Sequence, residues 1–252
     1  MKPRLLKHIH TDDRATSMAC EKIFTDGTDD SAVEIYRGAR NTLYDVTDDT
    51  GNHLCVKHFR KAKFPNSYIY TTLRHSKARR SFEHAEHLLA LGFCTPSPIA
   101  WSERRKGLKL LDSYYICEFL PLSNIRDWGK RPDSEALIEA LGLFMVNLHR
   151  AGIYHRDFSP GNILAELLPD GSYRFYLVDI NRMNFNVTNR AKLMSMFRSI
   201  SLDEADTIRL AKAYAKASGE NPDTITAEAI ASLKKYQATK RRHRKLKKLI
   251  KN

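Results

Sequence analysis

The fold of this chain is decided by the stretch Ile153-Tyr154-His155-Arg156-Asp157-Phe158-Ser159-Pro160-Gly161-Asn162-Ile163-Leu164. A strand-like run begins at its end, turns at residues 169–172, and returns as a second strand-like run that ends at Val178. Asp179 comes next, seventeen residues after Asn162. Two carboxylates and one amide therefore stand just before and just after a predicted hairpin. We expect the first loop to carry catalysis and the second to bind a metal ion.

The spacing of Asp157 and Asn162 matches H-R-D-x-x-x-x-N, the catalytic loop of protein kinases. In that loop the aspartate receives the proton of the acceptor hydroxyl, and the asparagine binds Mg²⁺. Asp179 stands where the metal-binding aspartate of D-F-G would stand. We interpret Asp157 as the catalytic base and Asn162 and Asp179 as Mg²⁺ ligands.

A strand lysine and a helix glutamate complete the set in kinase order. Lys57 lies in a predicted strand, like the lysine of V-A-I-K, and is expected to bind ATP. Glu83 lies on the next predicted helix and can pair with Lys57, with Glu86 one turn further on as the alternative. A strand lysine by itself is ordinarily solvated, so the prediction rests on the combination with Asp157, Asn162 and Asp179.

The nucleotide-binding segments are less regular. The phosphate loop Tyr36-Arg37-Gly38-Ala39-Arg40-Asn41 has one glycine where G-x-G-x-x-G has three. Its backbone N–H groups can still cover phosphates, with Arg40 adding charge, and the alternative is an ordinary turn with a weakened nucleotide site. The hinge is expected at Glu118-Phe119-Leu120, where backbone groups of Glu118 and Leu120 would bind adenine.

The pattern of elements predicts an α+β, bilobal protein-kinase-like fold. We expect a five-stranded antiparallel N-lobe with one inserted helix, over 33–121, and a short, mainly helical C-lobe, over 122–230. The inserted helix runs from Ser76, its N-cap, to Leu91, and Gly92 ends it. The five strands are expected at 33–36, 42–46, 53–59, 108–111 and 114–120, the last two forming a hairpin that a strand-like run at 99–101 precedes. Residues 1–32 are an N-terminal segment without assigned structure.

Helical periodicity governs the second half of the chain. One helix is expected from Ser134, with Gly152 closing it, and later ones at about 189–200, 203–218 and 224–250. Gly219 is the expected C-cap of the third of these helices. Residues 231–252 form a basic helical tail.

The 252-residue chain carries a net charge of +13, which indicates an anionic partner. The cations gather between Lys57 and Arg80 and in the tail, where Lys234–Lys251 contains ten Lys or Arg residues. Aromatic residues lie among the first group, a mixture that suits an anionic membrane surface or glycolipid. Nucleic acid is a second choice, and a solvated surface remains the ordinary interpretation.

Compartment signals are few. The four cysteines form no C-x-x-C pair, the first residues hold no signal-peptide-like apolar stretch, and no run of about 18 apolar residues occurs. We therefore expect reduced thiols and a protein of the cytoplasm that does not span a membrane.

At residues 155–164 and 177–183, supported by 91–100, the chain resembles the lipopolysaccharide kinase family, the Kdo- and heptose-kinase-like branch of the kinase superfamily. The resemblance covers roughly residues 33–215. It implies an ATP-dependent kinase at the cytoplasmic face of a bacterial inner membrane that phosphorylates a sugar of the lipopolysaccharide core. Asn181 replaces the glycine of D-F-G, as it does in this family.

The residues themselves favour a small or lipid-linked acceptor. Protein kinases usually place lysine two residues after the catalytic aspartate, where this chain has Ser159. Pro160-Gly161-Asn162 is similar to the P-G-N of small-molecule phosphotransferases, and no A-P-E follows Asp179. The alternatives are a RIO-like protein kinase and an inactive kinase fold that serves as a basic binding module.

Overall fold

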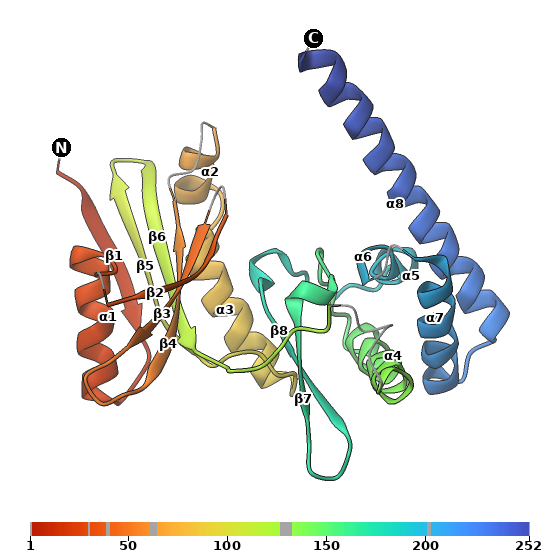
Figure 1. Cartoon of the computed structure of the whole chain (residues 1–252). Helices are drawn as coiled ribbons and strands as arrows, with labels where there is room; N and C mark the ends of the chain where they lie inside the picture. The colour runs from red at the N-terminus through yellow and green to blue at the C-terminus, as the bar shows by residue number, and fades with distance from the viewer. Residues whose placement is uncertain are drawn as a thin grey trace. The chain divides into compact units, whose positions relative to one another are not determined.

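The computed structural model describes residues 2–29, 31–38, 41–60, 65–126, 133–200 and 203–251 (Figure 1). The chain divides into two compact units. The first is Met1–Pro121 together with Asp179–Asn181, and the second is Leu122–Val178 together with Arg182–Asn252. Asp179 thus belongs to the first unit although its chain neighbour Val178 belongs to the second.

The first unit is built on a six-stranded antiparallel sheet with the strand order β1-β5-β6-β4-β3-β2. The strands are β1 (Arg4–Ile9), β2 (Val33–Arg37), β3 (Asn41–Thr47), β4 (His53–Phe59), β5 (Pro98–Lys106) and β6 (Lys109–Glu118). Three helices accompany them, α1 (Arg14–Asp26), α2 (Asn66–Thr72) and α3 (Lys77–Ala90).

Helices α1 and α3 lie on opposite faces of the sheet (Figure 1), and each face carries a hydrophobic cluster. Cys20, Ile23 and Phe24 of α1 pack with Leu54 and Val56 of β4 on one face. On the other face, Ala78 and Phe82 of α3 pack with Phe59, Tyr115 and Cys117. Because side chains alternate along a strand, Lys57 of β4 points to the same face as Phe59, towards α3.

The start of α3 is as predicted. Ser76 Oγ accepts a hydrogen bond from the Arg79 backbone N–H at 3.1 Å, which satisfies one of the donors that a helix N-terminus leaves open. After the helix, Gly92 has φ +80°, a conformation that a residue without Cβ adopts at no steric cost.

The N-terminal sheet has one strand more than the five expected. β1 pairs with β5 along its length and α1 covers a sheet face, so residues 4–26 are part of the first unit. β1 is mostly exposed and joins the edge of the sheet through its backbone, so its side chains show no hydrophobic alternation. The inserted region is also richer than expected, with α2 preceding α3.

The hairpin expected from residues 108–111 and 114–120 is wrong. Both runs belong to the single strand β6, whose hairpin partner is β5, and the turn lies at Gly107 with φ +59°. Asp112, which lies between the two predicted runs, is part of β6, and its carboxylate pairs across the strands with Arg104. The residues at the end of β5 are charged and lack the apolar pattern of a strand, so the predicted run at 99–101 is shorter than β5.

The second unit combines helices with a two-stranded hairpin, β7 (Ile163–Leu167) and β8 (Tyr173–Leu177). Its helices are α4 (Ser134–Arg150), α5 (Arg190–Met194), α6 (Phe197–Ile200), α7 (Glu204–Ser218) and α8 (Pro222–Lys251). The helix expected at 189–200 is divided into α5 and α6. Gly219 caps α7 with φ +78°, as predicted. In the described part of the chain, no helix has the length and apolarity needed to cross a membrane.

Candidate active site

Lys57 and Asp179 form an ion pair in the first unit. Lys57 Nζ donates to Asp179 Oδ1 at 2.6 Å, and its ammonium group lies 5.4 Å from the centroid of the Phe59 ring. The Lys57 side chain is 12% exposed and that of Asp179 is 36% exposed. The pair is therefore partly desolvated on the lysine side, while the carboxylate remains accessible to a ligand.

Asp179 has a left-handed backbone with φ +56°, one of two such non-glycine residues among those described. This conformation is uncommon for residues with a Cβ, although Asp and Asn tolerate it better than most. The side chain of Asn181 supports it, since Asn181 Nδ2 donates to Asp179 Oδ1 at 2.8 Å. The Oδ1 atom of Asn181 is buried and has no hydrogen-bond partner among the described residues.

Helix α3 holds the backbone that follows Asp179. Arg80 Nη1 donates to the Asn181 carbonyl at 2.6 Å, and His84 Nδ1 donates to the Ile180 carbonyl at 2.8 Å. Burial lowers the pKa of His84, which favours the neutral imidazole. Both residues were missed in the sequence, where nothing distinguishes them from other polar residues of an amphipathic helix.

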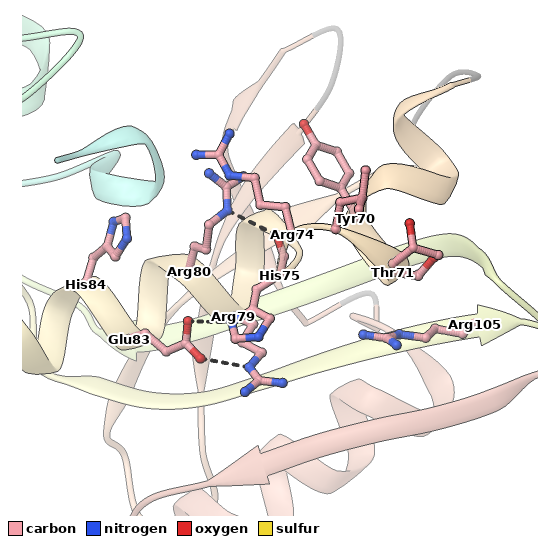
Figure 2. A pocket seen from close by; sticks show the side chains of 11 residues that line it. Tyr70, Thr71, Arg74, His75, Arg79, Arg80, Glu83, His84 and Arg105 are labelled. Carbon is pink, nitrogen blue, oxygen red and sulfur yellow. Dashed lines mark hydrogen bonds and ion pairs between the residues drawn. The ribbon is translucent and has the colours of Figure 1, made fainter.

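Glu83 does not contact Lys57. Its carboxylate accepts from His75 Nδ1 at 2.9 Å and from Arg79 Nε at 2.8 Å, as Figure 2 shows. Burial alone would raise the pKa of Glu83, but the bonds from His75 and Arg79 outweigh it and lower the pKa. Glu86, the alternative partner of Lys57, has its Oε1 3.3 Å from His10 Nδ1. Lys57 does not pair with Glu83 because its ammonium group bonds to Asp179 instead. On α3, the residues that contact residues 180–181 are Arg80 and His84.

In the second unit, His155 ties the Asp157 loop to the end of β8. His155 Nε2 donates to the Val178 carbonyl at 3.1 Å, and His155 Nδ1 accepts from the Asp157 backbone N–H at 3.2 Å. The histidine is 2% exposed, so both ring nitrogens are used in a buried setting. The Asp157 carboxylate itself is exposed and accepts no hydrogen bond from a described residue, which leaves it available as a base.

Asn162 is fixed to the same loop. Its Nδ2 donates to the Asp157 carbonyl at 2.9 Å, and its own carbonyl accepts from the Val178 N–H at 3.0 Å. Because the amide nitrogen is engaged, the amide oxygen is the atom left to meet a cation. At the neighbouring Gly161 a Cβ would fall 2.6 Å from Arg126 Nη2, so this arginine lies against the loop. Nothing in the sequence around Arg126 distinguishes it from an ordinary surface arginine.

The donor types fit Mg²⁺, which prefers oxygen ligands and keeps waters and substrate phosphate oxygens in its shell. Asp179 would supply a carboxylate and Asn162 an amide oxygen. No group of three or more His, Cys, Asp or Glu side chains that could hold a metal occurs among the described residues.

The predicted nucleotide-binding residues are placed as follows. Gly38 N–H donates to the Asn41 carbonyl at 2.9 Å, and a Cβ on Gly38 would fall 2.9 Å from the Tyr36 ring. Tyr36 therefore already contacts Gly38. Arg40 lies outside the described residues. The Glu118 N–H donates to the Ser97 carbonyl at 2.9 Å, whereas the Leu120 backbone has no hydrogen bond to a described residue.

Comparison with protein-family models identifies a family that matches most of the chain. Residues 27–214 match the model of the Lipopolysaccharide kinase (Kdo/WaaP) family. A curated relative, the lipopolysaccharide core heptose(I) kinase WaaP of Pseudomonas aeruginosa, is 26% identical over 117 residues. That alignment spans 42% of this chain and 44% of the relative, so the chain matches less than half of the relative's length.

Solved structures give the fold. A structure of WaaP in complex with acyl carrier protein has a TM-score of 0.57 and 19% identity, covering 94% of this chain and 97% of that one. A Rio2 kinase complex with ADP, Mg²⁺ and phosphoaspartate from Chaetomium thermophilum has a TM-score of 0.48 and 17% identity, covering 89% and 75%. The predicted α+β, kinase-like fold class is confirmed.

Proposed function

Because the chain belongs to the lipopolysaccharide kinase (Kdo/WaaP) family, we propose that it is an ATP- and Mg²⁺-dependent kinase that phosphorylates a sugar hydroxyl of the lipopolysaccharide core. The observation that carries the proposal is the Lys57–Asp179 pair, which joins the expected ATP-binding lysine to the expected metal ligand. The exposed, unbonded carboxylate of Asp157 on its fixed loop supports it.

Each residue has a separate task in this proposal. Asp157 receives the proton of the attacking hydroxyl, and His155 and Asn162 hold its loop at a fixed geometry. Lys57 exchanges its contact with Asp179 for the ATP phosphates and neutralises part of their charge. Bound Mg²⁺ would supply further charge neutralisation, with Asn162 and Asp179 as its protein ligands.

The acceptor is a sugar hydroxyl of heptose or of Kdo. Ser159 stands where protein kinases usually place lysine, which argues against a peptide acceptor. The curated relative is named a heptose(I) kinase, so a heptose-containing core oligosaccharide is the first acceptor to test and a Kdo-containing one the second.

We place the protein at the inner, cytoplasmic face of the membrane, where ATP is available. The exposed cations of α8, such as Lys240, Arg241 and Arg242, would contact anionic lipid there. Flotation with phosphatidylglycerol vesicles tests this placement. Binding that vanishes at high salt is expected, and equal recovery with neutral phosphatidylcholine vesicles would contradict it.

The activity test uses purified protein, labelled Mg-ATP and each of the two oligosaccharides. Asp157→Ala is expected to lower turnover by about 10²–10⁴-fold while nucleotide binding is retained. Asp170→Ala is the matched control, because Asp170 is an exposed acid in the β7–β8 turn and lies outside the loop.

The alternatives give different outcomes. Label transfer to protein in a lysate, with none to either oligosaccharide, would indicate a protein kinase. A chain that transfers no phosphate, and whose cellular role survives Asp157→Ala, would be a binding module.

A further inference from the structure

Two cysteines face each other across neighbouring strands of the first unit. Cys55 of β4 and Cys117 of β6 are directly opposite partners in the antiparallel register. On the sheet face that α3 covers, Cys117 belongs to the hydrophobic cluster and Cys55 packs against it. Both are free thiols, Cys117 buried and Cys55 partly exposed. A reagent that reaches Cys55 therefore meets a second thiol next to it.

The register places the two residues at a distance that a disulfide can span. The Phe119 N–H donates to the His53 carbonyl at 3.2 Å, two positions further along the same two strands. Hydrogen-bonded pairs alternate with non-bonded pairs in an antiparallel ladder, so Cys55 and Cys117 also form a hydrogen-bonded pair, with Cα atoms about 5.5 Å apart. Disulfides join residues whose Cα atoms are about 4.4–6.8 Å apart. The backbone positions therefore permit a bond between the two sulfur atoms.

The two thiols also contact each other, and the contact affects them in opposite directions. A hydrogen bond with Cys117 lowers the pKa of Cys55 against the opposing effect of burial, and the charge of Lys57 lowers this pKa further. The same bond, together with burial, raises the pKa of Cys117. Cys117 Sγ lies 3.8 Å from the Cys55 carbonyl oxygen as well. Because the thiolate is the nucleophile in thiol chemistry, Cys55 is the better attacking group of the two.

The other two cysteines lack this arrangement. Cys20 is buried against the opposite face of the sheet, and burial raises its pKa to about 12, which makes it a poor nucleophile. Cys94 is partly exposed and lies between α3 and β5. Among the strands that the structure describes, Cys55 and Cys117 are the one opposed pair of cysteines.

We propose that Cys55 and Cys117 form a modification site, at which a low-molecular-weight disulfide RSSR converts the two thiols into a disulfide across the strands. The Cys55 thiolate attacks one sulfur atom of RSSR, which gives a mixed disulfide and releases RS⁻. Cys117 then attacks Cys55 Sγ, breaks the mixed disulfide and releases a second RS⁻. The two thiol protons pass to the two RS⁻ groups. Two RSH form, and the two electrons that the cysteines lose reduce RSSR.

The register also indicates that the modification is reversible. In a hydrogen-bonded pair the Cβ atoms lie towards the upper end of about 4.5–5.5 Å, whereas a disulfide holds them about 3.8 Å apart. Closing this difference strains the disulfide and makes it easier to reduce. An excess of a small thiol therefore restores the two free cysteines.

The modification site lies among the predicted nucleotide-binding residues of the first unit. Cys55 is two residues before Lys57, so the two side chains share a face of β4, and Cys117 directly precedes Glu118 of the predicted hinge. A disulfide here fixes β4 to β6 between the lysine expected to bind phosphates and the segment expected to bind adenine. Oxidation therefore weakens ATP binding. This consequence rests on the proposed function, whereas formation of the disulfide does not.

The modification is tested by treating the folded full chain with oxidised glutathione, blocking the remaining thiols with iodoacetamide and mapping peptides by mass spectrometry. The expected product links the Cys55 peptide to the Cys117 peptide, and excess dithiothreitol should reverse the linkage. In Cys117→Ser, glutathione should instead remain attached to Cys55. Cys94→Ser is the matched control and should form the disulfide like the wild type. In urea, the shorter loop between Cys94 and Cys117 should favour that pair instead.

Wild-type protein in which Cys55 and Cys117 stay unlinked, or in which either is linked to Cys20 or Cys94 in the folded state, would overturn the proposal. This result needs no variant, so it holds even if a substitution at the buried Cys117 prevents folding.

The consequence is measured by calorimetric titration of Mg-ATP into the reduced and the oxidised chain. The oxidised wild type should bind Mg-ATP about tenfold more weakly or worse. Cys55→Ala cannot form the disulfide and should bind Mg-ATP equally well before and after treatment. Equal affinity of the reduced and oxidised wild type would overturn the consequence. If the reduced chain binds no Mg-ATP, the proposed function fails, and the peptide map still decides whether the disulfide forms.

Discussion

Lys57 Nζ and Asp179 Oδ1 lie 2.6 Å apart although 122 positions separate the two residues in the chain. The pair attaches Asp179 to the first compact unit. Its chain neighbour Val178 belongs to the second unit, where the carbonyl of Val178 accepts from His155 of the catalytic loop. One peptide bond thus joins the residue that contacts the lysine to the residue that anchors the Asp157 loop.

Replacing Lys57 by methionine is expected to remove activity without unfolding the first unit. Methionine has similar length and no charge, so the contact with ATP phosphates is lost and kcat/KM should fall by about 10²-fold or more. The ion pair is partly exposed at Asp179, so the free energy of unfolding should change by about 1 kcal/mol or less. Activity assays and urea unfolding measure both, with the exposed Lys106→Met as control. Activity close to wild type would contradict the assignment of Lys57.

The left-handed backbone of Asp179 predicts that two equally inactive variants of this residue differ in stability. Asp179→Gly and Asp179→Ala both lose the carboxylate and should both be inactive. The free energy of unfolding of the glycine variant should exceed that of the alanine variant by about 1 kcal/mol, because only alanine keeps a Cβ at φ +56°. Asn186, at φ +55°, provides the matched pair Asn186→Gly and Asn186→Ala in the second unit, where the same difference is expected. Equal urea midpoints for the two Asp179 variants would show that its backbone relaxes.

Local sequence signals predicted the parts of this structure that local physics controls. The α3 cap at Ser76, the strand at 53–59 and the end of α7 at Gly219 each follow from a few adjacent residues. The family resemblance, carried by residues 155–164 and 177–183, is also confirmed.

Long-range choices could not be predicted in this way. β1 gains its place through backbone pairing with β5, and its exposed side chains give no pattern. Lys57 pairs with Asp179 and not with Glu83, and this pairing depends on which face of α3 packs against residues 180–181. Arg80 and His84 decide that contact through carbonyl groups, which leave no trace in the sequence. The site residues other than this pairing remain predictions.

A close approach between α4 and α7 makes Gly142 sensitive to substitution. A Cβ at Gly142 would fall 2.7 Å from the backbone carbonyl carbon of Ala213 and 2.8 Å from the Tyr214 nitrogen. Alanine is the better helix former by about 1 kcal/mol, yet the backbone of α7 would have to move. Gly142→Ala should therefore destabilise the protein by about 1–3 kcal/mol in urea unfolding. The neighbouring Leu143→Ala, at an exposed position, should cost clearly less, and a stabilised Gly142→Ala would contradict the packing.

Buried His149 predicts acid sensitivity of the second unit. It is 9% exposed on α4, and its Nδ1 lies 3.0 Å from the Tyr214 hydroxyl oxygen, within hydrogen-bond distance. Burial first, and then the positive charge of Arg190, lower the pKa of His149 to about 4. An unfolded chain has a histidine pKa of about 6.5. Below that pH the unfolded state binds a proton that the native state excludes.

The contribution of His149 to stability is therefore complete above pH 6.5 and is lost as the pH falls towards 4. The whole loss is on the order of 3 kcal/mol. In the wild type, the free energy of unfolding measured in urea should be lower at pH 4.5 than at pH 7. In His149→Gln, the difference in this free energy between the two pH values should be clearly smaller. His87→Gln removes an exposed imidazole from α3 and serves as the control. If His149→Gln kept the full acid destabilisation, the sensitivity would have to arise from other groups that gain protons in this range, namely carboxylates or the histidines His58 and His84, whose pKa values burial also lowers.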